Sequence, residues 1–65
     1  MREELLKASE QHFKALVEKH RMNVEVYLTN PAGIGEHSDI MEAIETELSQ
    51  MAEYDDKLEM LKKHF

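Results

Sequence analysis

The sequence predicts an all-α protein, an antiparallel two-helix hairpin that dimerises into a four-helix bundle. The single Pro and both Gly residues of the 65-residue chain fall in one segment, residues 30–35 (NPAGIG). On both sides of this segment apolar residues recur every seven positions, the spacing of one face of a helix. We therefore expect one helical-hairpin domain over residues 1–65, with helices at about 2–29 and 39–64 and a turn over 30–38.

The first helix is predicted from four residues spaced by seven: Leu6, Phe13, His20 and Tyr27. Opposite charges four residues apart, such as Glu10 and Lys14, support it on the solvent side. Residues 24–29 alternate like a short strand and are rich in β-branched and aromatic side chains. Helix is still preferred there, because a lone strand would have no partner within this chain for its backbone groups.

The turn and the second helix follow from the residues after position 29. Asn30, Pro31 and Gly33 occupy positions that a type I turn favours. Asp39, with Glu42 three residues later, is typical of a helix N-cap. The apolar repeat of the second helix has the same period as that of the first: Ile44, Met51, Leu58 and Phe65.

A hairpin of this size leaves much of its apolar surface in water. A domain of about 60 residues buries only about 60% of the surface of its unfolded chain. Further apolar residues lie beside the two central rows: Leu5, Met22, Val26, Leu28, Met41 and Met60. A symmetric dimer that forms a four-helix bundle would cover the apolar surfaces of both hairpins. The expected oligomer core comprises Phe13, Leu16, His20, Tyr27, Ile44, Leu48, Met51 and Leu58.

Composition excludes several classes of protein. The chain has no Cys, which excludes a disulfide framework and a thiolate zinc site. No apolar run approaches the roughly 20 residues of a membrane span. The net charge of −6 argues against direct nucleic-acid binding. We expect a cytoplasmic protein that contacts neither membrane nor nucleic acid and needs no cofactor.

One polar cluster precedes the second helix: Glu36, His37 and Asp39. A His beside two carboxylates has the residue types of a general base or a metal site. The chain lacks the ligand spacings of known zinc sites and the Glu-x-x-His pairs of metal-binding bundles. Helix capping by Ser38 or Asp39 is therefore the preferred interpretation, and a metal-dependent or hydrolytic site is the alternative.

Acidic residues are concentrated after the turn. Residues 1–29 carry five acidic and five basic side chains, whereas residues 36–65 carry nine acidic side chains and three Lys. This surplus either keeps the protein in solution or forms a surface that binds a basic protein. The residues of this candidate acidic face are Glu42, Glu45, Glu53 and Asp56.

Two segments carry a resemblance: residues 30–40 (NPAGIGEHSDI) and residues 52–58 (AEYDDKL). They resemble small uncharacterised proteins of T-even-like tailed phages, especially marine cyanophages, over the chain from about His20 to its end. The resemblance implies a phage product in the cytoplasm of an infected bacterium, and it carries over no catalytic or binding residue.

The function expected from these observations is that of a non-enzymatic, homodimeric interaction module. Its partner would be a basic host or phage protein bound through the acidic face. Two alternatives stay open: a metal-dependent or hydrolytic activity, and a purely structural oligomer.

Overall fold

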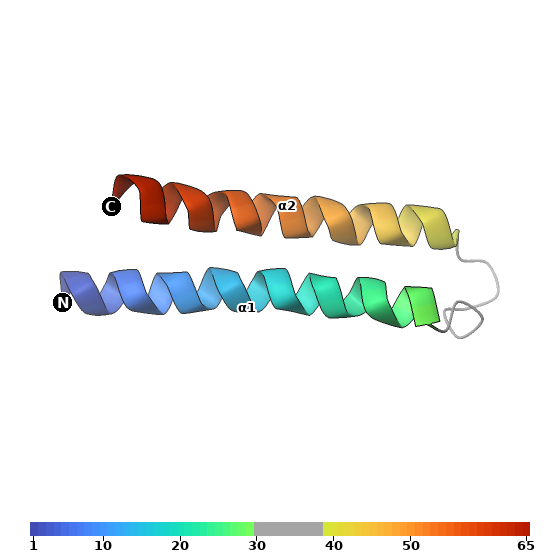
Figure 1. Cartoon of the computed structure of the whole chain (residues 1–65), viewed down its shortest axis with the longest axis horizontal. Helices are drawn as coiled ribbons and strands as arrows, with labels where there is room; N and C mark the ends of the chain where they lie inside the picture. Colours follow the sequence, from blue (N-terminus) through green and yellow to red (C-terminus); the bar gives the residue numbers. More distant parts are fainter. Residues whose placement is uncertain (30–38) are drawn as a thin grey trace.

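The structure is a computed structural model that describes residues 1–29 and 39–65. Helix α1 spans Arg2–Thr29 and helix α2 spans Ile40–His64. The two helices lie side by side and run antiparallel, so both chain termini are at one end (Figure 1). The predicted hairpin is confirmed, and residues 24–29 are helical rather than extended. The predicted turn over residues 30–38 lies outside the described residues.

Helix α2 begins with the predicted cap. Asp39 has extended backbone angles (φ −77°, ψ 103°), and its carboxylate accepts a hydrogen bond of 3.0 Å from the main-chain N–H of Glu42. This bond satisfies one of the N–H groups that a helix start leaves without a partner. Lys62, Lys63 and His64 lie in the last turn of α2, where positive charge suits the helix dipole.

Replacing Asp39 by Ala is expected to lower the free energy of unfolding by about 1 kcal/mol, because the cap bond is lost. For a chain of this size such a loss lowers Tm by about 4–8 °C, which thermal melting followed by circular dichroism would measure. Asp39→Asn keeps an oxygen acceptor and should melt close to the unchanged protein. An Asn variant as unstable as the Ala variant would contradict a capping role.

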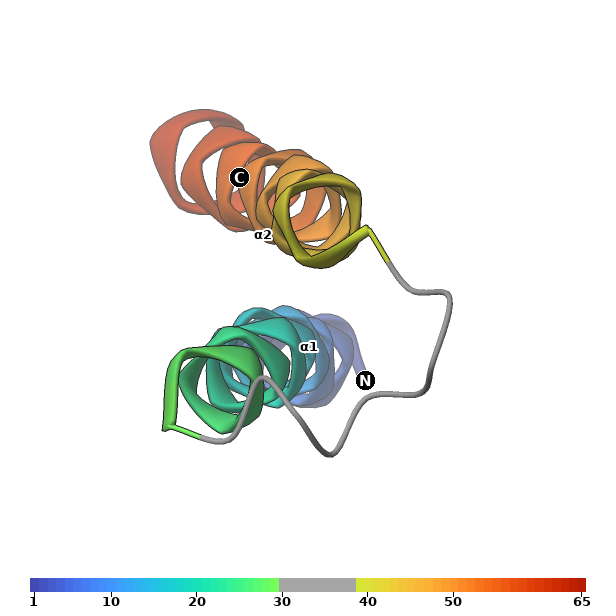
Figure 2. The same cartoon turned by 90° about the vertical axis from the view of Figure 1, so that its right-hand side faces the viewer.

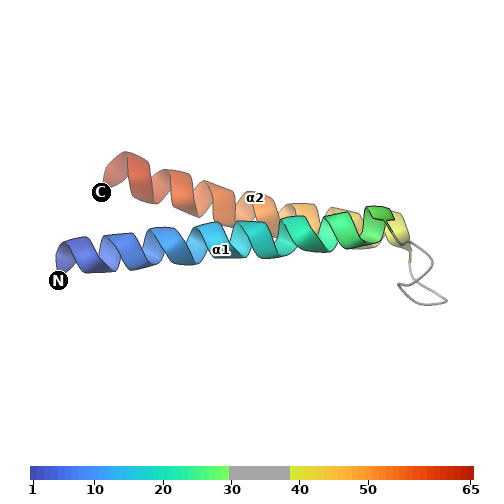
Figure 3. The same ribbon diagram turned by 60° about the horizontal axis from the view of Figure 1, so that its bottom comes forward.

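The helices meet in one register along their whole length. Three contacts define it: Arg2 with the Phe65 carbonyl, Phe13 with Tyr54, and His20 with Glu47. In each pair the residue numbers add up to 67, as expected for antiparallel helices without a slip. The helices cross at a shallow angle (Figures 2 and 3), which lets a seven-residue repeat stay at the contact.

This contact is the only packing surface in the described part of the chain, and it does not form a closed core. No described residue is fully buried. The radius of gyration is 14.9 Å, whereas a compact chain of 65 residues has about 11 Å. The accessible surface is 5133 Å², against about 4,300 Å² for a compact monomer of this mass.

Most of the expected oligomer core lines the contact between the two helices. The half-buried members are Phe13, Leu16, His20, Tyr27, Ile44, Met51 and Leu58. Leu48 is 50% exposed and lies outside this contact. Other large apolar side chains are more exposed, including Leu28 at 60% and Met41 at 78%. The hairpin therefore leaves part of its apolar surface uncovered.

Candidate functional site

The predicted polar cluster before α2 is described only in part. Glu36 and His37 lie outside the described residues, and Asp39 is exposed and serves as the N-cap of α2. Within residues 1–29 and 39–65, no three His, Asp or Glu side chains lie close enough together to hold a metal ion. The capping interpretation of Asp39 is confirmed.

The acidic face is exposed on α2. Glu42, Glu45, Glu53 and Asp56 all face solvent. Glu42 and Asp56 are fourteen residues apart and so lie on one line along the helix. Glu53 forms an ion pair with Lys57 at 3.8 Å, and both side chains are about half exposed. Over residues 40–56, α2 carries acidic side chains and no Lys or Arg.

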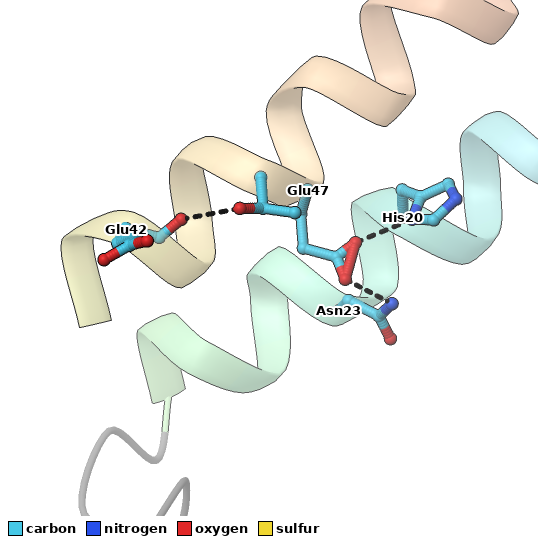
Figure 4. A network of polar contacts seen from close by, with 5 residues as sticks. His20, Asn23, Glu42 and Glu47 are labelled. Atoms are coloured by element: carbon cyan, nitrogen blue, oxygen red, sulfur yellow. Dashed lines mark hydrogen bonds and ion pairs between the residues drawn. The ribbon is translucent and has the colours of Figure 1, made fainter. Parts of the chain in front are cut away.

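A partly buried polar cluster lies between the helices, near the middle of the hairpin. The Nδ1–H of His20 donates to Oε2 of Glu47 over 2.6 Å, and the amide of Asn23 donates to Oε1 of Glu47 over 2.9 Å (Figure 4). The side chains of His20 and Glu47 are only 12% and 14% exposed. Both carboxylate oxygens of Glu47 on α2 are thus bound by donors from α1.

Aromatic rings extend this cluster towards the chain termini. The His20 ring stacks on Tyr54 with ring centroids 5.9 Å apart and planes 7° from parallel. Tyr54 also stacks on Phe13, with a centroid separation of 6.4 Å. The ammonium group of Lys57 lies 5.2 Å from the centre of the Tyr54 ring, at the distance of a cation–π contact. Tyr54 therefore joins the polar cluster to the apolar part of the contact.

The surroundings of Glu47 favour its charged form. The hydrogen bond from His20 lowers the pKa of Glu47 below its ordinary value of 4.5, and the Asn23 bond and the charges of His20 and Lys19 act in the same direction. Partial burial opposes them. Because the net direction is downward, Glu47 is ionised at neutral pH and is a strong acceptor for both donors.

Glu47 was not singled out from the sequence, and this cluster was missed. The signal that could have found it is the row Ile40, Glu47, Tyr54 and Leu61, which has the same seven-residue period as the apolar rows. His20 was expected to face inward, and its position is confirmed. A polar residue at such a position specifies the register of a helix pair rather than adding to its apolar packing.

Neither helix of the described residues is long and apolar enough to cross a membrane. No protein-family model matches the chain, and comparisons with curated proteins and with solved structures found no significant similarity.

Proposed function

We propose that the chain is a non-enzymatic protein–protein interaction module that forms a homodimeric four-helix bundle and binds a basic protein through its acidic face. The observation that carries this proposal is the absence of any fully buried side chain among the described residues, together with several large apolar side chains that are half exposed or more. A surface of this kind is stable in water when a partner covers it.

Self-association is the most economical way to cover the apolar surface. Two-helix hairpins reach a closed core by pairing two copies into a four-helix bundle. The accessible surface exceeds that of a compact monomer of this mass by about 800 Å², so the hairpin alone covers less of its surface than a closed domain does.

The proposed binding of a basic protein rests on the acidic face. Glu42, Glu53 and Asp56 are exposed in the hairpin and lie away from the contact with α1. A surface with one sign of charge speeds and selects binding to a surface of the opposite sign. The resemblance of residues 30–40 to small phage proteins supports an accessory role in the cytoplasm of an infected bacterium, where the partner is a basic host or phage protein.

The test is capture of bacterial cytoplasmic proteins on the immobilised chain, followed by mass spectrometry. Basic proteins should be retained at an ionic strength of about 0.15 M and released near 1 M, over which the Debye length falls from about 8 Å to about 3 Å. Glu42→Lys combined with Asp56→Lys is expected to abolish this retention, because it reverses two charges of the acidic face.

The matched control is Glu3→Lys combined with Glu25→Lys on α1, which changes the net charge by the same amount at a different place. Retention that survives in this control and is lost in the α2 variant supports the acidic face. An equal loss of retention in both variants would show that net charge, rather than the acidic face, accounts for the binding of basic proteins. A dimer that retains no basic protein would instead favour the purely structural oligomer.

A further inference from the structure

The hairpin has two long sides, and they differ in chemistry. A groove between the helices is lined by Val17 of α1 and by Met51, Ala52 and Asp55 of α2. We call this the Val17 side. Successive residues of a helix are rotated by about 100° about its axis. In both helices, a residue that directly follows a contact residue therefore lies on the Val17 side, and a residue that directly precedes a contact residue lies on the opposite side. We call that opposite side the Met22 side, since Met22 precedes the contact residue Asn23.

On the Val17 side both helices contribute exposed apolar residues. Leu28 follows Tyr27 on α1, and Met41 and Leu48 follow Ile40 and Glu47 on α2. These three side chains are 60%, 78% and 50% exposed, respectively. Together with the groove at Val17 they form an apolar strip that spans both helices.

The Met22 side has most of its exposed large apolar residues on one helix. Leu5, Met22 and Val26 lie there on α1, and each is more than half exposed. On α2 the corresponding positions include Gln50, Glu53 and Lys57, and Met60 is the large apolar residue among them, at 37% exposed. A second copy on this side would cover mainly polar groups of α2 and would gain a large apolar contact from that helix only at Met60.

Charge is divided between the two helices of the Val17 side. On α1 the row one residue after the contact carries basic side chains: Lys7, Lys14 and Arg21. On α2 the same side carries three acidic side chains, Glu45, Asp55 and Glu59, and one basic side chain, Lys62, near the end of the helix. Lys14 and Arg21 pair with Glu10 and Glu18 of their own helix, at 3.2 Å and 2.8 Å. These pairs are exposed to solvent and hold the basic side chains weakly.

We infer that a second copy of this chain docks on the Val17 side with its α2 against α1 of the first copy, and with the termini of both copies at the same end. This inference rests on the proposed self-association. It adds which side of the hairpin forms the dimer interface and how the second copy is oriented relative to the first. A two-fold axis parallel to the helices relates the two copies in this arrangement. Residues of α1 then face residues of the second copy's α2 in the same register as within one hairpin, with residue numbers that add up to about 67. Arg21 then faces Glu45 of the second copy, Lys7 faces Glu59, and Leu28 faces Met41.

The opposite direction brings like charges together. With the two-fold axis perpendicular to the helices, α1 lies on α1 of the second copy and α2 lies on α2. When the two copies overlap along their whole length, Glu45 of one copy then lies near Glu59 of the other. Like charges that face each other across an interface disfavour an arrangement, so the division of charge selects the first direction. In that arrangement Glu45 belongs to the interface, and the rest of the acidic face stays outside it.

The side is tested with Leu48→Lys and the matched variant Met22→Lys. The replaced side chains are 50% and 51% exposed in the hairpin, so neither change removes a packed residue from it. By analytical ultracentrifugation, Leu48→Lys should raise the dimer dissociation constant by about 30-fold or more, as at an interface hot spot. Met22→Lys should leave it within about threefold. Dissociation in both variants, in neither, or in Met22→Lys alone would overturn the choice of side.

The direction is tested with one spin label per chain at Glu4→Cys, whose native side chain is 85% exposed and which becomes the only Cys of the protein. Pulsed EPR should give a distance of about 15–30 Å between the two labels, since helices in bundles lie 8–10 Å apart. The opposite direction places the labels more than about 35 Å apart, and that result would overturn the inference while leaving the dimer intact. A wild-type chain that stays monomeric would instead overturn the self-association proposed above.

Discussion

Replacing Tyr54 by Ala is expected to lower the free energy of unfolding by about 2 kcal/mol. The ring stacks on both His20 and Phe13 and lies under the ammonium group of Lys57. Truncating a fully buried aromatic residue costs about 3–5 kcal/mol, and Tyr54 is half-buried, so the loss is smaller. In a hairpin without a closed core, this loss is a large part of the total stability.

Urea unfolding followed by circular dichroism measures this change. The chain concentration must be held constant, because self-association adds to apparent stability. Tyr54→Phe keeps both stacked rings in place and should unfold within about 0.5 kcal/mol of the unchanged protein. A Phe variant as unstable as the Ala variant would show that the hydroxyl, rather than ring stacking, stabilises the contact.

Replacing Glu47 by Gln is expected to destabilise the hairpin at neutral pH by about 1–2 kcal/mol and to reduce its sensitivity to acid. At neutral pH the variant loses the charge-assisted bond from His20, which accounts for the first effect. The second effect follows from linkage. Because folding lowers the pKa of Glu47, its stabilising contribution is present above the ordinary carboxyl pKa of 4.5 and is lost as the pH falls through the lowered value.

Urea unfolding at a series of pH values from 7 downwards tests both effects. The unchanged protein should lose more stability on acidification than Glu47→Gln, and the two stabilities should converge once Glu47 is protonated. Asp56→Asn makes the same charge change at an exposed position of the same helix outside the proposed interface, and its stability should follow that of the unchanged protein with pH. Parallel pH curves for the unchanged protein and Glu47→Gln would contradict the role of the carboxylate.

Local sequence signals predicted the helices and their ends well. The heptad rows of Leu6 and Ile44 indicated two helices, and the only Pro and Gly residues separated them. Ser38 or Asp39 was predicted as the cap, and the structure has Asp39, whose side chain reaches an N–H group within the same turn. Such features depend on residues within one or two turns, which a single sequence displays directly.

The polar cluster could not be predicted in the same way. Asn23 and Glu47 are 24 residues apart, and only the antiparallel register brings them within 2.9 Å. An acidic residue in an amphipathic helix is usually solvent-exposed, so the sequence alone does not mark Glu47 as a residue of the helix contact. Its position becomes clear only when His20 and Asn23 are seen to occupy both of its carboxylate oxygens.

The sequence by itself thus determined the helical class, the lengths of α1 and α2, and the concentration of acidic charge on α2. Each depends on composition or on spacing along one chain segment. The tertiary structure decided which acid enters the helix contact and which exposed apolar residues share the Val17 side. These properties depend on the rotation and register of one helix against the other, which arise only when the two helices pack.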